Sequence, residues 1–263
     1  MLKKNLQKIV FIGAGNVATS LSDSLKDKRE IIQVYSKTLA HAKTLGQKLK
    51  CTYTNDLKKI ALHADLYIIA VKDDAIEKVC KSLKLNGKLV IHTSGSTNLD
   101  ILKNISKKYG VLWPMYSFAG KAKLASGTPF FIEASNKKDE KVLTDLVNEM
   151  KGKPYYINSE ERAKVHLAAV FINNFPNHLF VIAEALCKEA GIPFKLFLPL
   201  AKETFENITK QSPVLSQTGP ASRNDKQILN KHLALLKLHP LYMDIYKILT
   251  KSIIQTSSGR KKL

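Results

Sequence analysis

The sequence has little arginine, little cysteine and no long uninterrupted apolar run. Its three cysteines, Cys51, Cys80 and Cys187, are far apart in the chain. Scattered cysteines in odd number form neither a disulfide framework nor a metal-binding spacing, so we expect no metal site and a reducing, cytoplasmic location. No apolar run approaches the roughly 18 residues that cross a bilayer, and the first residues lack the apolar core of a signal peptide. We therefore expect no membrane association.

The shortage of arginine also limits what the net charge can mean. The 42 basic and 22 acidic residues give a formal charge of +20, yet only four of the basic residues are arginine. Nucleic-acid binding normally shows as a dense basic patch with arginine and exposed aromatic side chains. Here the lysines are dispersed, and only residues 259–263 resemble a basic extension. We expect a lysine-rich solvated surface and no nucleic acid as partner.

The first half of the chain alternates between two periodicities. Short apolar runs rich in β-branched residues alternate with amphipathic helical stretches. Continuous apolar strands joined by helices predict a parallel sheet covered on both faces, which is an α/β fold of Rossmann type. Strands are predicted at residues 8–12, 31–35, 65–71, 88–92, 110–113 and 130–133, and helices at 16–25, 38–49, 56–60, 73–83 and 99–108.

The pattern changes near residues 152–154, after which almost everything has helical period. A turn-rich loop at residues 211–220 interrupts the helices. We predict two domains, residues 1–154 with the parallel sheet and residues 155–263 with helices alone. The helices are predicted at residues 159–189, 194–210, 224–236 and 240–254.

A glycine-rich turn follows the first predicted strand and opens the first helix. The run Gly13-Ala14-Gly15-Asn16-Val17-Ala18 fits the pattern G-x-G-x-x-G/A. Gly13 permits the tight turn, Gly15 lets the backbone approach a pyrophosphate, and the N–H groups of Asn16 and Val17 lie at the positive end of the helix. We predict that this turn binds a dinucleotide; a purely structural glycine turn is the alternative.

The residues after the second strand indicate which dinucleotide is bound. An NAD site places Asp or Glu here to accept hydrogen bonds from the ribose hydroxyls. This sequence has no carboxylate there and offers Ser36, Lys37 and Thr38 instead, two hydroxyls and a cation that suit a 2′-phosphate. We predict NADP as the cofactor, although Lys37 could also be an ordinary surface lysine.

Two further strands end in residues that suit a cofactor site. Val71 and Asp73 follow one strand, and Thr93 and Ser94 follow the next. Ligands of open α/β sheets bind outside the carboxyl ends of the strands, so we expect these residues near the cofactor. Two structural alternatives remain: Asp73 or Asp74 as the N-cap of the next helix, and the Ser94 segment as an ordinary polar turn.

The long predicted helix 159–189 carries an unusual set of polar side chains among apolar neighbours. His166 and Asn173 are seven residues apart, and Asn174 and His178 are four apart, which places each pair on one stripe of an α-helix. Buried amides and imidazoles need partners, so the stripe indicates either a cleft or a subunit interface. Imidazoles titrate near neutrality, which makes His166 our candidate for proton transfer.

These motifs together resemble a known family. The sequence is similar to Rossmann-like proteins with a helical C-terminal domain of unknown function, within the group of pyrroline-5-carboxylate reductase, the deazaflavin-dependent NADP oxidoreductases and 6-phosphogluconate dehydrogenase. The resemblance covers nearly the whole chain, and its most specific segments are residues 13–18, 64–76, 92–95, 165–175 and 218–225.

The resemblance implies a function and an assembly. It implies a nucleotide-binding first domain, and a helical second domain that binds substrate and forms a homodimer. It also implies that the loop with Thr218, Gly219 and Arg223 lies near the cleft, where Arg223 would hold a substrate carboxylate. The Lys-x-x-x-Asn signature of the hydroxyacid dehydrogenases is absent, because Val170 stands four residues after His166.

We therefore expect an NADP-dependent reductase that acts on a small C=O or C=N substrate. The predicted catalytic residues are His166 as proton donor, Ser94 and Asn174 as orienting groups, and Arg223 as substrate anchor. A nucleotide-binding sensor without turnover is the alternative, which the missing lysine signature keeps open. A basic nucleic-acid-binding protein is a third class, supported by charge alone.

Overall fold

A computed structural model describes residues 8–118 and 123–260 of the chain. The first seven residues and the end of the basic extension, residues 261–263, lie outside the described residues. The chain divides into two compact units, Met1–Asn174 and Phe175–Leu263. We call these the sheet unit and the helical unit, and each is described by itself.

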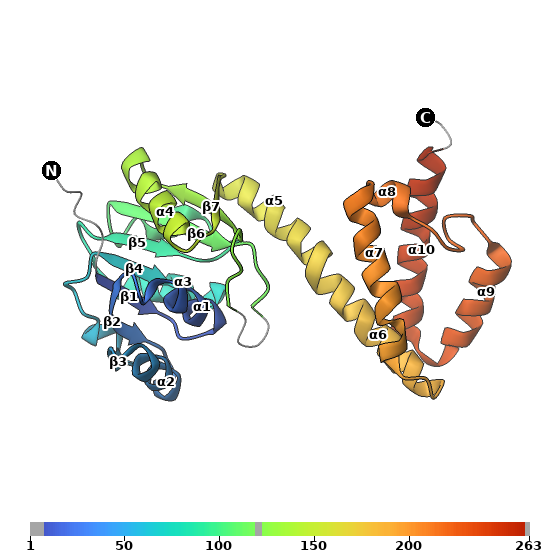
Figure 1. The fold of residues 1–263 in the computed structure, drawn as a ribbon, viewed down its shortest axis with the longest axis horizontal. Helices are drawn as coiled ribbons and strands as arrows, with labels where there is room; N and C mark the ends of the chain where they lie inside the picture. The colour runs from blue at the N-terminus through green and yellow to red at the C-terminus, as the bar shows by residue number, and fades with distance from the viewer. Residues whose placement is uncertain (1–7, 119–122, 261–263) are drawn as a thin grey trace. The chain divides into compact units, whose positions relative to one another are not determined.

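The sheet unit is built on one eight-stranded sheet with the order β3-β2-β1-β4-β5-β6-β7-β8 (Figure 1). All neighbouring strands are parallel except β6 and β7. The order reverses direction at β1, which is the topological switch point of a doubly wound fold. The strands are β1 (Lys8–Ile12), β2 (Glu30–Tyr35), β3 (Thr52–Thr54), β4 (Leu66–Ile69), β5 (Leu89–His92), β6 (Lys108–Pro114), β7 (Pro129–Ala134) and β8 (Lys153–Tyr156).

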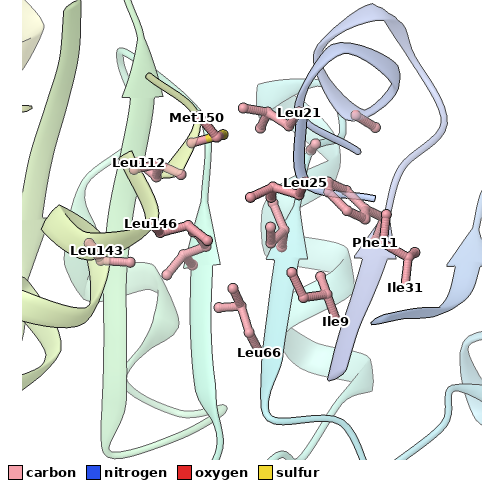
Figure 2. Close-up of a cluster of buried hydrophobic side chains, with 14 of the residues drawn as sticks. Ile9, Phe11, Leu21, Leu25, Ile31, Leu66, Leu112, Leu143, Leu146 and Met150 are labelled. Atoms are coloured by element: carbon pink, nitrogen blue, oxygen red, sulfur yellow. The ribbon is translucent and has the colours of Figure 1, made fainter. Parts of the chain in front are cut away.

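Helices cover both faces of this sheet. The helical segments of the unit are α1 (Asn16–Leu25), α2 (Leu39–Leu49), η1 (Leu57–Lys59), α3 (Asp73–Ser82), η2 (Leu99–Leu102), α4 (Lys137–Glu149), α5 (Ser159–Ala169) and the π-helical η3 (Val170–Asn174). Side chains alternate across β1, so that Phe11 joins the buried cluster that also contains residues of α1 and α4, and Ile12 joins the cluster that contains residues of α3. Figure 2 shows the first cluster, with Leu25 of α1 and Leu146 of α4 over the same face. The predicted α/β fold with a parallel sheet is confirmed.

Most predicted elements are present, and one helix is wrong. The segment predicted as a helix over 99–108 has only one 3-10 turn, Leu99–Leu102, before β6 begins at Lys108. Leu102 and Ile105 are both fully buried under the sheet. The sheet requires this short segment to turn back into β6, so the chain cannot extend a helix through it. Strands β3 and β8 and helix α4 were not predicted, and the predicted domain boundary between residues 154 and 155 falls inside β8.

The helical unit contains only helices among its described residues, and it begins later than the predicted helical domain, residues 155–263. They are α6 (Phe175–Glu189), η4 (Phe194–Phe197), α7 (Leu198–Lys210), α8 (Pro213–Ser216), α9 (Lys226–Leu235), η5 (Leu236–Leu238) and α10 (Pro240–Arg260). Gly191, with φ of +70°, ends α6 in the left-handed conformation that favours glycine. Proline stands in the first turn of α7 and of α8, where its missing N–H costs nothing.

One described helix is long and apolar enough to cross a membrane by length and composition alone. It is the continuous helix Ser159–Glu189, whose most apolar window has a mean hydropathy of 1.3 and no buried residue. Polar residues interrupt its apolar sequence, so the helix contains no uninterrupted apolar run of the length that a membrane span was expected to need. A single helix of this kind is weak support for a membrane span, because an apolar helix at a subunit interface has the same composition.

The contacts place the start of this long helix with the sheet. Residues 159–174 belong to the sheet unit, whereas the sequence pattern predicts the domain boundary between residues 154 and 155. A buried arginine, Arg162, holds the first turns of α5 to the sheet, as the site below shows. The assignment of residues 155–263 to substrate binding and dimerisation stays a prediction.

Candidate functional site

Gly13 ends β1 in a conformation and a space that only glycine fits. Its φ is +128°, and an added Cβ would lie 2.0 Å from the carbonyl oxygen of Ala70. Its N–H donates to the carbonyl of Tyr35 at 2.8 Å. Gly13 therefore joins the ends of β1, β2 and β4 at the switch point of the sheet, where doubly wound folds bind nucleotides.

Gly15 stands in the opposite situation, because a Cβ there would meet nothing within 4 Å. It is the N-cap of α1, and no side chain caps that helix end. The adjacent Asn16 is exposed, and its side-chain amide donates to the carbonyl of Phe118 at 2.7 Å. The open space over Gly15 and the uncapped N–H groups fit a pyrophosphate, which would accept those hydrogen bonds. Val17, also predicted to contact the cofactor, is the second residue of α1 and is partly buried.

The predicted specificity residues follow β2 at the same edge of the sheet. Ser36 is partly buried, and its N–H donates to Thr54 at 3.1 Å, while Lys37 and Thr38 are exposed. Thr38 is the N-cap of α2 without using its hydroxyl as a cap. Among the described residues, the Thr38 hydroxyl does not cap the helix and the Lys37 ammonium group is exposed, so both groups can contact a 2′-phosphate.

The structure excludes the helix-cap alternative for Asp73, while its place near the cofactor stays a prediction. The N-cap of α3 is Lys72, so neither Asp73 nor Asp74 caps the helix, and both lie in its first turn. Asp73 instead accepts a hydrogen bond from the Ser96 hydroxyl at 2.5 Å. This bond links the segment after β4, which contains Val71, to the turn after β5.

The turn after β5 is organised by Ser94. Its hydroxyl oxygen accepts the N–H groups of Ser96 at 3.2 Å and Thr97 at 3.0 Å. Ser94 is 6% exposed, and its N–H donates to Nδ1 of His92 at 3.2 Å. Thr93 precedes it with its N–H bonded to Ile69 at 3.1 Å. The Ser94 hydroxyl also lies 3.4 Å from the Ser96 hydroxyl, which itself donates to Asp73, so Ser94 shapes the turn through three local contacts.

His92 is a neutral side chain inside the fold. It is fully buried, and among the described residues no group pairs with its Nε2. Burial, together with the positive charge of Arg162, lowers the pKa of His92 to about 3. Because Nδ1 accepts the Ser94 N–H, the proton of the neutral ring is on Nε2.

His166 packs directly on the turn after β5. A Cβ on Gly95 would lie 2.6 Å from Cδ2 of His166 and 2.7 Å from Cε2 of Trp113. The imidazole and indole rings meet edge to face, with centroids 5.6 Å apart. The structure thus brings together two segments that the sequence separates by about 70 residues, His166 and the turn that contains Ser94. A small residue at position 95 is required for this approach.

A buried ion pair that the sequence did not indicate holds α5 in this place. Arg162 is 1% exposed and pairs with Glu133 of β7. Its guanidinium also donates to the carbonyl of Thr97 at 2.5 Å and to the Ser159 hydroxyl at 3.1 Å. In the sequence, the run of two glutamates before this arginine is typical of an exposed helix start. The only sequence feature that could have pointed to Arg162 is that the chain has just four arginines.

Asn174, the second predicted orienting group, ends the π-helical segment and is exposed. Pro176 follows closely and lacks the N–H that an α-helix would use, which accounts for the wider turn. The wider turn departs from the 3.6-residue period on which the predicted stripe of His166 and Asn173 is based, and that stripe stays a prediction. Asn177 and His178 belong to the helical unit and are exposed.

Arg223 lies in the loop before α9 of the helical unit and is exposed. The loop is shaped by Gly219, with φ of +100°, and by Ser222, whose hydroxyl donates to the Gly219 carbonyl at 2.9 Å. Asp225 then caps α9 by accepting the N–H of Ile228 at 3.2 Å. Local bonds therefore fix the loop without using the guanidinium.

Two families match parts of the sequence. Residues 8–95 match the family described as coenzyme F420-dependent NADP oxidoreductase. Residues 128–253 match a domain of unknown function, DUF2520. No curated protein sequence matches the chain significantly.

Solved structures match over nearly the whole chain. A Bacteroides fragilis protein described as a candidate NADP oxidoreductase is 37% identical, with a TM-score of 0.88 over 95% of this chain and 98% of that one. A reductive aminase from Aspergillus terreus, solved with NADPH4, cyclohexanone and allyl amine, has a TM-score of 0.74 at 15% identity, over 97% and 95% of the chains. A 1-pyrroline-5-carboxylate reductase from Streptococcus pyogenes has a TM-score of 0.61 at 18% identity, over 96% and 98%. The last two show likeness of fold alone.

Proposed function

Because the chain belongs to the NADP oxidoreductase-like family that joins such a nucleotide domain to a DUF2520 domain, we propose that it is an NADP-dependent reductase. It acts on a small C=O or C=N substrate that carries a carboxylate. The observation that carries this proposal is the contact of His166 with Gly95. Because of this contact the His166 imidazole lies beside the turn at the carboxyl end of β5, on the sheet edge that carries Gly13 and Gly15, which supports our proposal that it is the proton donor.

The nucleotide is NADP, and the geometry of the edge fits it. The open space above Gly15 receives the pyrophosphate, and Lys37 with Ser36 and Thr38 receives the 2′-phosphate. Val71, Asp73 and Thr93 border the nicotinamide end. When bound, the cofactor supplies the hydride, while the protein supplies positioning and protons.

His166 delivers the proton to the substrate oxygen or nitrogen. Its ring is partly buried against Trp113, which limits its rotation while leaving part of it accessible. The Ser94 hydroxyl and the Asn174 amide orient the substrate, and Arg223 binds its carboxylate through a two-point pairing. These roles for Ser94, Asn174 and Arg223 are assigned by chemistry and can be separated by mutation.

The protein works as a homodimer in the cytoplasm. The helical unit exposes many large apolar side chains, more than a stable monomer normally leaves in water. Examples of these exposed side chains are Leu196, Leu200, Leu215, Leu235, Leu238, Leu241 and Ile248. A second copy of the chain covers them, and sedimentation or light scattering of the full chain measures the dimer directly. The free cysteines Cys51, Cys80 and Cys187 agree with a reducing compartment.

The test combines cofactor titration with turnover. NADPH should bind more tightly than NADH, and a panel of carboxylate-bearing ketones and imines should oxidise NADPH. His166→Ala should lose most turnover and retain NADPH binding. Tight NADPH binding without turnover on any substrate would favour the sensor alternative, and equal affinity for NADH would contradict the NADP assignment.

A further inference from the structure

The buried ion pair Arg162–Glu133 connects three elements around the candidate site. Glu133 is on β7, Arg162 is on α5, and Thr97, which accepts a hydrogen bond from Arg162, follows β5. Glu133 also accepts the N–H of Ser159 at 2.9 Å and its hydroxyl at 2.7 Å. In turn, the Ser159 hydroxyl accepts the N–H of Leu99 at 3.0 Å. The first turn of α5 is therefore bonded to both the sheet and the turn after β5.

The geometry of an α-helix transmits this anchoring to His166. Residues four apart on a helix lie on the same face, so Arg162 and His166 point to the same side of α5. Val165, between them, packs against Trp113 and its neighbours. Asn158 and Glu161 form a capping box that fixes the helix start. The opposite face, with Lys164 and Leu167, is exposed, and Lys164 pairs there with Glu160 of the same helix.

The partner of His166 is fixed as well. The ring of Trp113 stacks on that of Phe131 with centroids 5.3 Å apart, and the rings of Phe131 and Tyr155 have centroids 5.8 Å apart. The indole is thus held by β7 and β8, while the imidazole is held by α5. The anchoring of α5 therefore contributes to the distance between the two rings.

We propose that the Arg162–Glu133 pair is a positioning device, which sets the contact of His166 with Gly95 and Trp113. Arg162 itself is 1% exposed, so it has no direct access to a ligand. This inference rests on the proposed function, because Arg162 and Glu133 are positioning residues of the proposed reductase site. The geometric statement can be tested without cofactor or substrate.

Trp113 is the single tryptophan of the sequence, which makes it the reporter. A protonated imidazole in contact with an indole quenches its fluorescence. Emission of the full-length protein should rise in one step with increasing pH, and the step that we assign to this contact is the one that His166→Gln removes. The surrounding elements carry several titratable or charged side chains, among them Asp73, His92, Tyr109, Glu133, Tyr155 and Arg162, which is why the step is defined by its loss in His166→Gln.

The decisive variant is the pair Arg162→Met with Glu133→Leu, which removes both charges and leaves no buried charge unpaired. We expect the step to fall to less than about half of its amplitude while the protein stays folded, because the apolar pair no longer bonds Thr97 and Ser159. The conservative variant Arg162→Lys keeps the charge and one bond, and should restore part of the step.

The matched control is Arg29→Met, since Arg29 forms a similar ion pair with Glu149 of α4, away from these elements. It should keep the full step even though it also loses an ion pair. An undiminished step in the double variant would overturn the positioning role. Failure to bind NADPH would contradict the proposed function instead, and leaves the fluorescence result standing.

Discussion

His166 meets Trp113 edge to face, with ring planes inclined at 65° and centroids 5.6 Å apart. Gly95, in the turn after β5, contacts both rings. The two rings therefore mark a position at the carboxyl edge of the sheet, close to Ser94. Any ligand that reaches this turn comes within range of the indole.

The first prediction uses this proximity. Bound NADPH absorbs where tryptophan emits, so excitation of Trp113 should give sensitised NADPH emission and a matching loss of tryptophan emission. The measurement is a titration of the full chain with NADPH. Trp113→Phe should bind NADPH and give no sensitised emission. Binding by calorimetry without any energy transfer in the unmodified protein would contradict a site beside Gly95.

The second prediction separates the two glycines of the phosphate loop. Gly13→Ala should destabilise the protein by at least about 2 kcal/mol, because the strained φ and the overlap with Ala70 each cost roughly 1–3 kcal/mol. Gly15→Ala should cost less than about 1 kcal/mol in stability, since its Cβ meets open space. Gly15→Ala should instead weaken NADPH binding by roughly tenfold, or about 1.4 kcal/mol.

Urea unfolding and cofactor titration of both variants check this pair. Unchanged NADPH affinity in Gly15→Ala would show that the pyrophosphate lies elsewhere. An unchanged unfolding free energy in Gly13→Ala would contradict the close approach to Ala70.

The parts of the fold that depend on local signals could be predicted from sequence. The first strand, the helix Asn16–Leu25 and the glycine turn between them have strong periodicity and an unambiguous turn residue. The predicted helix 99–108 failed because its apolar residues suit a helix and a buried turn equally well. Only the neighbouring strands decide between them.

The candidate site was predictable only one segment at a time. His166 and Ser94 each stood out by residue type, whereas their proximity depends on how α5 is anchored. That anchor, Arg162 with Glu133, joins residues 29 apart whose sequence context is ordinary. Asp73 shows the same limit, because a helix cap and a partner for Ser96 look alike before β4 and β5 are aligned.

The third prediction concerns the choice between NADP and NAD. Lys37→Ala should weaken NADPH binding by about tenfold, or roughly 1.4 kcal/mol, and leave NADH binding almost unchanged, because only NADPH carries the 2′-phosphate. Lys43→Ala is the matched control, since Lys43 is another exposed lysine close by on α2. An equal loss for both cofactors, or an equal loss in the control, would mean that Lys37 contributes only general charge.

The fourth prediction concerns the stability contributed by the buried ion pair. Arg162→Met alone should lower the free energy of unfolding by about 3 kcal/mol, because it leaves the Glu133 carboxylate without its ion-pair partner among partly buried groups. The double variant with Glu133→Leu should recover most of that loss. Lys164→Met breaks the exposed pair with Glu160 on the same helix and should cost less than about 1 kcal/mol. Urea unfolding of the variants measures the coupling, and additive effects of the two buried substitutions would contradict it.

The fifth prediction follows from the neutral, buried His92. Its pKa is lowered to about 3 by burial and by Arg162, while an unfolded histidine titrates near about 6.5. Between these values the unfolded chain binds more protons, so acid favours unfolding. The stability that His92 contributes is complete above pH ~6.5 and is lost as the pH falls toward 3, at about 1.4 kcal/mol per pH unit.

His92→Asn removes this titration and keeps an oxygen that can accept the Ser94 N–H. The unfolding free energy of the unmodified protein should fall more steeply than that of the variant, by roughly 2–3 kcal/mol between pH ~6.5 and ~4.5. Carboxylates elsewhere titrate in both proteins and cancel in the comparison. Parallel pH profiles would mean that His92 takes up its proton in the folded state, which its buried and unpaired Nε2 should prevent.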